Sequence, residues 1–197
     1  EEETVREDAA NGVVESGTCG DNLTWTLDEE GTLTISGSGS IKKSAFESDD
    51  RIKKVIINNS CTSIGNSAFY DCEKLTSITI PDSVTSIGGS AFEGCTGLTN
   101  ITVPDSVTSI GNGAFYGCTN LKTLYLGKHI SNLKTGAFAN CGKLRNIYCR
   151  ATTPPSRGDY AFMFDGSTGY TSYVGALIYV PASAVSAYKS QKKKKNW

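Results

Sequence analysis

The stretch LTSITIPDSVTSIGGSAFEGC, residues 75–95, is followed by a near copy, LTNITVPDSVTSIGNGAFYGC, at residues 98–118. Both contain the dipeptide Ala-Phe, which recurs along the chain at steps of 23, 23, 23, 23 and 24 residues, with its phenylalanines at Phe46, Phe69, Phe92, Phe115, Phe138 and Phe162. A fixed period of this length is the signature of stacked, similar structural units. The sequence therefore predicts a repeat solenoid of about five to six 23-residue repeats.

Other apolar positions keep the same period. An aliphatic residue stands five positions before each phenylalanine, at Ile41, Ile64, Ile87, Ile110 and Leu133. A cysteine stands three positions after it, at Cys72, Cys95, Cys118 and Cys141. A unit this short cannot bury its own large side chains, so it must stack on its neighbours. We expect equivalent residues, the phenylalanines and these cysteines above all, to form continuous ladders in one shared core.

Each repeat also contains the pattern Leu-x-x-Ile-x-Ile, whose end alternates apolar and polar residues. Alternation of period two is typical of a short strand with one buried face. Pro81 and Pro104 follow two of these strands and lack the amide proton needed to continue the hydrogen-bonded ladder. We expect consecutive repeats to contribute one strand each to a short parallel sheet, in a right-handed superhelix of the β/α type.

The two ends of the chain predict caps. Leu23, Trp25 and Leu27 alternate with threonines, and Gly31 lies in the turn before a second alternating run, which indicates a β-hairpin. We expect Trp25 to cover the first rung, including Phe46. At the other end, Pro181 closes the strand LIYV, and Ser183 is placed to cap a helix with Val185 and Tyr188 on one face.

These features divide the chain into four parts. Residues 1–16 form an acidic lead-in, 17–40 the hairpin cap, 41–181 the solenoid with an insertion near 163–176, and 182–197 the capping helix with its basic tail. We expect the lysines at 192–195 to lie in or beyond the last helical turn, where cations oppose the negative helix end.

Composition and motifs argue against several functions. The net charge of −1 indicates no dedicated nucleic-acid binder, and no apolar run is long enough to cross a membrane. The cysteines lack zinc-ligand spacing and are expected to be buried structural residues. Stacking would place Asp82 and Asp105 about 5 Å apart, but both lie in a solvated turn, so we expect them to stabilise the turn rather than to catalyse a reaction or bind calcium. The single histidine, His129, has no catalytic partners in the pattern. We expect no enzyme activity, cofactor or metal.

The repeat LTSITIPDSVTSIGGSAFEGC resembles the treponemal type of leucine-rich repeat found in BspA-like bacterial surface proteins. The resemblance covers roughly residues 35–181, and the segments SGTCGDNLTWTLDEEGTLTISGSG and IYVPASAVSAYKSQ resemble the ends of such proteins. The family implies secretion or display on the surface of a bacterium, with the signal peptide removed, and binding rather than catalysis.

The outward positions of the predicted strands suggest where binding occurs. They become aromatic toward the carboxyl end, with Tyr125, Tyr148 and Tyr179, and are flanked by Lys122 and Arg145. One hypothesis is an adhesin-like module that recognises a host extracellular protein or glycan through this face. The alternatives are that the tyrosines only stack on one another, and that the chain is a structural spacer within a larger surface protein, without its own ligand.

Overall fold

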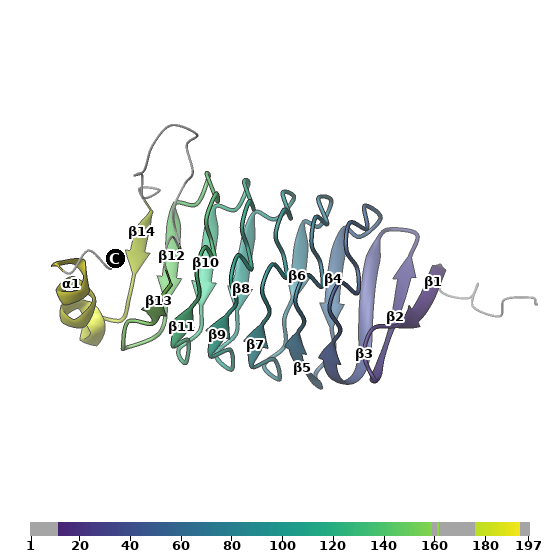
Figure 1. The fold of residues 1–197 in the computed structure, drawn as a ribbon, viewed down its shortest axis with the longest axis horizontal. Helices are drawn as coiled ribbons and strands as arrows, with labels where there is room; N and C mark the ends of the chain where they lie inside the picture. Colours follow the sequence, from purple (N-terminus) through teal and green to yellow (C-terminus); the bar gives the residue numbers. More distant parts are fainter. Residues whose placement is uncertain (1–11, 159–160, 162–175, 194–197) are drawn as a thin grey trace, which may run out of the picture.

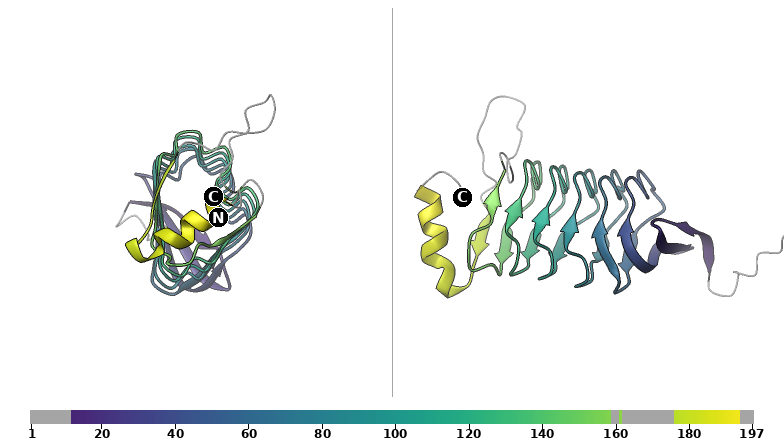
Figure 2. Two further views of the ribbon diagram at one scale, coloured as in Figure 1. Left: turned by 90° about the vertical axis from the view of Figure 1, so that its left-hand side faces the viewer. Right: turned by 60° about the horizontal axis from the view of Figure 1, so that its bottom comes forward.

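The computed structural model describes residues 12–158, 161 and 176–193, which form an elongated β-solenoid (Figure 1). The expected positions of Phe162, of the insertion and of the tail beyond residue 193 lie outside the described residues. Seen along the long axis, the repeats superimpose on one another (Figure 2). The solenoid predicted from the 23-residue period is therefore confirmed.

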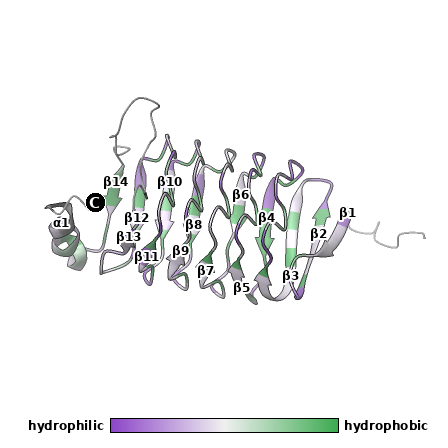
Figure 3. Ribbon diagram, viewed as in Figure 1, coloured by the Kyte–Doolittle hydropathy of each residue, from purple (hydrophilic) through white to green (hydrophobic). Residues whose placement is uncertain are grey.

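The first face of the solenoid carries one strand per repeat. Its strands are β4 (Lys54–Ile57), β6 (Ser77–Thr79), β8 (Asn100–Val103), β10 (Thr123–Leu126), β12 (Asn146–Cys149) and β14 (Leu177–Tyr179). Paired neighbours are parallel and in register, so that Leu124 lies between Ile101 and Ile147. Along β8, β10 and β12, buried apolar residues alternate with more exposed and more hydrophilic ones (Figure 3), as the pleat requires for one buried face.

A second parallel sheet, which we did not predict, lies across the core. It consists of β5 (Cys61–Ile64), β7 (Ser86–Ile87), β9 (Ser109–Ile110), β11 (Asn132–Leu133) and β13 (Ser156–Arg157). Most of these strands are two residues long, which is too short for an alternating pattern to appear in the sequence. The sheet follows the corner that begins at Pro81 or Pro104, and it directs the aliphatic ladder of Ile64, Ile87 and Ile110 inward.

The third side of each repeat, around Ala-Phe, consists of turns rather than helices. Two residues per repeat have positive φ, two positions before and two after the phenylalanine; examples are Ser67, Asp71, Gly113 and Gly117. Their N–H groups and that of the phenylalanine donate to carbonyls of the next repeat, as Phe92 N–H does to Ala114 O at 2.7 Å. Positive φ favours glycine and small polar residues, which explains the Ser, Asp, Asn and Gly found there.

The phenylalanines form the predicted ladder. Phe46, Phe69, Phe92, Phe115 and Phe138 stack with ring centroids 5.1–5.3 Å apart, and none is more than 5% exposed. The centroid spacing follows from the distance between adjacent strands, which is about 4.8 Å. Each ring therefore fills the core between its two neighbours.

The cysteine ladder has a role beyond filling space. The thiols of Cys72, Cys95, Cys118 and Cys141 each donate to the carbonyl of the phenylalanine 26 residues earlier, with Sγ···O distances of 3.0–3.2 Å. The backbone N–H groups of Cys72, Cys95 and Cys118 also donate, each to the carbonyl of the phenylalanine three residues earlier. Cys95 N–H, for example, donates to Phe92 O at 3.2 Å. The thiol thus adds a second hydrogen bond to carbonyls that already accept a backbone N–H, and it links adjacent repeats through the core.

The amino-terminal cap is the predicted hairpin with one further strand. β2 (Asn22–Asp28) and β3 (Thr32–Ile41) are antiparallel, Gly31 has φ of 85°, and β1 (Val13–Thr18) pairs with the outer edge of β2. Trp25 meets Phe46 edge to face at a centroid distance of 5.6 Å, so it closes the phenylalanine ladder as expected.

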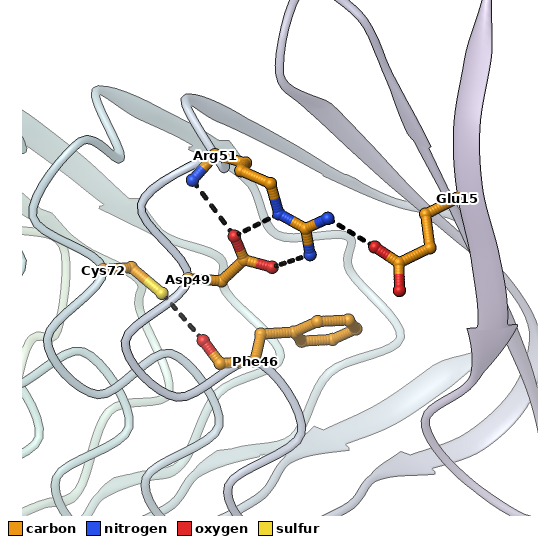
Figure 4. A network of polar contacts seen from close by, with 5 residues as sticks. All are labelled: Glu15, Phe46, Asp49, Arg51 and Cys72. Atoms are coloured by element: carbon orange, nitrogen blue, oxygen red, sulfur yellow. Dashed lines mark hydrogen bonds and ion pairs between the residues drawn. The ribbon is translucent and has the colours of Figure 1, made fainter.

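An exposed ion-pair network joins this cap to the first repeat. The guanidinium of Arg51 donates to Asp49 at 2.7 and 2.9 Å and also to Glu15 of β1 (Figure 4). The hydrogen bond from Arg51 lowers the pKa of the Asp49 carboxyl. Because the Arg51 and Glu15 side chains are about half exposed, we assign the network to orientation of the cap rather than to a large gain in stability.

The carboxyl-terminal cap differs in detail from the prediction. A 3-10 turn, η2 (Ala182–Ala184), precedes α1 (Val185–Lys193), and Ser183 lies inside that turn, so its expected capping role is wrong. Val185 is 36% exposed, and the buried residues are Ala184 and Tyr188, one helical turn apart. The Tyr188 hydroxyl donates to Ala151 O at 3.1 Å, which fixes the helix across the end of the solenoid (Figure 2).

The ladder predicts the cost of removing one ring. Phe92→Ala should lower the free energy of unfolding by about 3–5 kcal/mol, because it removes a buried ring that contacts Phe69 and Phe115 and leaves a cavity between them. Chemical denaturation measures this change. The exposed Thr79→Ala serves as the control and should cost less than about 1 kcal/mol; equal losses in the two variants would contradict the ladder.

Burial of the cysteines predicts their reactivity. All seven are free and buried, so none should react with an aromatic disulfide reagent in the native protein, and all seven should react once the chain is unfolded. Spectrophotometric thiol titration with and without denaturant provides the measurement. A native thiol that reacts as fast as free cysteine would show that the repeat containing it is not closed to solvent.

The same burial predicts how stability depends on pH. Desolvation raises the pKa of Cys72 to about 11 and that of Cys141 to about 12, from an ordinary value of 9.0. Between these values the native state keeps protons that the unfolded chain loses, so the free energy of unfolding should fall as pH rises above 9.0. Denaturation at a series of alkaline pH values measures this fall. In Cys141→Ala the free energy of unfolding should fall less steeply with pH than in the wild type, and an equal slope in the two proteins would contradict the prediction.

Candidate functional site

The candidate binding surface is the outer side of the first sheet. The pleat directs one central side chain of each strand away from the core, and these are Ile56, Thr79, Thr102, Tyr125, Tyr148 and Tyr179. Their register is that of the strands, so Tyr125 lies beside Thr102 on one side and Tyr148 on the other. The face therefore changes from small hydroxyl residues to aromatic rings between β8 and β10.

The three tyrosines form a stack of nearly parallel rings, which we call the tyrosine ladder. The centroids of Tyr125 and Tyr148 are 4.9 Å apart and those of Tyr148 and Tyr179 are 4.5 Å apart, with interplanar angles of 11° and 12°. The stacking that the sequence offered as an alternative is thus present. Tyr125 and Tyr179 remain 43% and 42% exposed. A threonine beside Tyr125 is too small to cover the ring, so one face of Tyr125 stays open toward β8.

Basic residues lie where β10 and β12 begin. Lys122 and Arg145 are exposed and stand on adjacent repeats, joined by a backbone hydrogen bond from Arg145 N–H to Lys122 O at 3.0 Å. Within residues 12–158, 161 and 176–193, the Arg145 guanidinium donates to neutral groups, the carbonyls of Gly142 and Leu144. Lys143, which the sequence analysis did not single out, donates to the side-chain oxygen of Asn120 at 2.6 Å. Among the described residues, no ion pair involves these three cations.

One apolar residue adjoins this surface and was not anticipated. Leu177 of β14 is 61% exposed and lies two residues before Tyr179 on the same side of the strand. Its outward position follows from pairing of Leu177 with Asn146, whose side chain also points away from the core. The only signal in the sequence was its place in the final strand, where the repeat pattern is least regular.

Of the two acidic corner residues, Asp105 makes structural contacts through both carboxylate oxygens. Asp105 accepts a hydrogen bond from Lys128 N–H at 2.8 Å through one carboxylate oxygen and binds Arg150 at 3.2 Å through the other. His129 is exposed, and its Nδ1 lies 2.9 Å from the backbone oxygen of Asp105. Asp105 therefore holds successive corners together, and Asp82 is an exposed turn residue.

The described part of the chain contains no cluster of three or more His, Cys, Asp or Glu side chains suited to a metal ion. In the same residues, no helix has the length and apolar character needed to cross a membrane.

The fold and its exposed sheet define the class of protein. A solenoid with short parallel strands, one per repeat, and an aliphatic and aromatic core has the architecture of a leucine-rich repeat protein. Residues 39–166 match the BspA type leucine rich repeat region in six copies, and the chain belongs to this family.

Solved structures of bacterial proteins share the fold. A leucine rich cell surface protein from Faecalibacterium prausnitzii is 25% identical with a TM-score of 0.56, and the match covers 76% of this chain and 40% of that one. The leucine-rich repeat protein of Treponema pallidum is 21% identical with a TM-score of 0.52, over 87% and 92% of the two chains. The pneumococcal vaccine antigen PcpA is 20% identical with a TM-score of 0.63, over 87% and 44%. A comparison with curated proteins gave no match.

Proposed function

We propose that this chain is a ligand-binding module displayed outside a bacterial cell, and that it recognises a protein or glycan through the outer side of its first sheet. The observation that carries the proposal is the tyrosine ladder with its adjacent basic residues. The chain spans about 40% of the length of the Faecalibacterium cell surface protein, so its relatives support a module within a surface protein.

Physical reasons favour binding over a purely structural role for these tyrosines. Three stacked rings cover the sheet, but stacking does not require Tyr125 to leave a ring face open, nor Leu177 to remain exposed. Tyrosine and arginine are among the side chains that most often anchor partners. A solenoid keeps them on a rigid surface whose outward residues vary independently of the core.

Catalysis is not part of this proposal. The Asp105 carboxylate binds Arg150 and a backbone N–H rather than a second acid, and His129 faces a backbone oxygen at an exposed corner. The cysteine thiols have raised pKa values because they are desolvated, which opposes a nucleophilic role.

Substitution of the ladder tests the proposal. We expect the double variant Tyr125→Ala/Tyr148→Ala to lose at least about tenfold in affinity for whichever matrix protein or glycan the wild-type chain retains on an array, since hot-spot aromatics contribute about 2 kcal/mol or more. Surface plasmon resonance measures the affinity, and circular dichroism establishes that the variant is folded.

Tyr70→Ala is the matched control, because Tyr70 is a half-buried tyrosine on the turn side of the solenoid. It should leave binding unchanged. If the folded double variant binds every retained ligand as well as the wild type does, or if broad arrays retain no ligand, the sheet face is not a binding site and the chain acts as a spacer.

A further inference from the structure

We infer that the sheet face is specific for an acidic glycan, whose anionic groups bind Lys122, Lys143 and Arg145 while a sugar ring packs beside Tyr125. This inference rests on the proposed function and names the ligand class of the same surface. It starts from the distribution of charge, which is far from even although the chain as a whole carries a net charge of −1.

The outer side of the first sheet carries only positive charge from β4 to β12. The strands and the residue that precedes each of them contain four cations and no carboxylate; the cations are Lys53, Lys54, Lys122 and Arg145. Asp82 and Asp105 lie beyond the opposite ends of the strands, and Asp105 already binds Arg150, whereas the exposed acids at the basic edge, Asp50 and Glu73, precede only β4 and β6. An anionic ligand therefore meets no carboxylate along the part of this edge where β8, β10 and β12 begin.

Lys122, Lys143 and Arg145 form the densest part of this edge. Lys122 and Arg145 occupy equivalent positions on adjacent repeats, where like charges repel one another. The hydrogen bonds of Arg145 and Lys143 go to two carbonyls and one amide oxygen, which orient these side chains without neutralising them. A sulfate or carboxylate placed between the cations would relieve that repulsion and complete their charge-assisted hydrogen bonds.

The surface next to the cations suits a sugar better than a protein. Hydroxyl and amide side chains lie between and beside the basic edge and the tyrosine ladder: Thr99, Asn100, Thr102, Thr123 and Asn146. Such groups match the hydroxyls of a polysaccharide, whereas a protein partner needs a desolvated apolar centre in its interface. The open face of Tyr125 offers the flat apolar surface on which a sugar ring packs.

The dimensions agree with an extended polymer. Lys122 immediately precedes β10 and lies three residues before Tyr125, which in extended chain is about 10 Å. Lys54 and Asn146, which starts β12 beside Arg145, are four 23-residue repeats apart along the solenoid axis, or about 19 Å at the usual spacing of neighbouring strands. A chain of several sugars laid along the axis would reach both basic ends of the edge, and a disaccharide would reach only one.

The test uses heparin as an acidic polysaccharide, neutral dextran and poly-L-glutamate, with affinities measured by isothermal titration calorimetry. We expect heparin to bind, to weaken as salt is raised, and to bind more tightly as an oligosaccharide long enough to span the edge than as a disaccharide. We expect little binding of dextran or poly-L-glutamate.

Two triple variants separate a site from general charge attraction. Lys122→Gln/Lys143→Gln/Arg145→Gln should lower heparin affinity by at least about tenfold, because three charge-assisted contacts are lost. Lys43→Gln/Lys134→Gln/Lys189→Gln removes the same charge from exposed positions outside this face and should change affinity by less than about threefold. Tyr125→Ala should weaken heparin binding in the presence of all three cations.

The contrary outcomes are distinct. No heparin binding, equal loss in both triple variants, or equal affinity for poly-L-glutamate would overturn the acidic-glycan assignment. If the chain instead binds a protein or a neutral glycan, with loss in Tyr125→Ala/Tyr148→Ala and no competition by heparin, the acidic-glycan assignment fails and the proposed function stands. If neither heparin nor any array ligand depends on the tyrosines, both fail.

Discussion

The structure depends on one constraint: each repeat must satisfy the backbone of the next one at a separation of about 4.8 Å. On two sides this happens through parallel strands, and on the third through N–H groups around Ala-Phe that donate to the following repeat. Every equivalent side chain is then carried to the same spacing, so the phenylalanine rings stack at 5.1–5.3 Å as a consequence of the backbone rather than of ring attraction. The thiol bonds to phenylalanine carbonyls add a further link between adjacent repeats.

The same constraint organises the surface. Residues at the same outward position of successive repeats lie in one row along the solenoid. Where the residue type changes from one repeat to the next, the chemical character of that row changes. The tyrosine ladder begins where Thr102 gives way to Tyr125, and the basic edge is strongest where Thr99 gives way to Lys122 and then Arg145. Both changes fall on the same repeats. The part of the sheet with the largest aromatic surface is therefore also the part with the most unneutralised positive charge, which is why we place the ligand there.

The caps show how an open stack is closed. At the amino end, β3 continues both sheets, since its first half pairs with β4 and its second half with β5, and Trp25 covers the first phenylalanine. At the carboxyl end, α1 is joined to the last repeats through Tyr188, whose hydroxyl also lies 3.2 Å from the thiol of Cys149. Ile178 nevertheless remains 38% exposed, although its partner Ile147 in the neighbouring strand is buried. The two ends are thus closed to different extents.

The sequence alone determined the repeat, its period, the residues of the core and the outward direction of the three tyrosines, because a 23-residue period and an alternating strand fix which side chains are equivalent and which face they share. It also showed the hairpin and the place of Trp25. The second sheet was not evident, since two-residue strands carry no period of their own, and Ser183 was misplaced because the 3-10 turn replaced the expected cap. Only the tertiary structure revealed the thiol bonds, the neutral partners of Arg145 and Lys143, and the binding of Asp105 to Arg150. These contacts depend on side-chain directions across adjacent repeats, and residue spacing does not specify those directions.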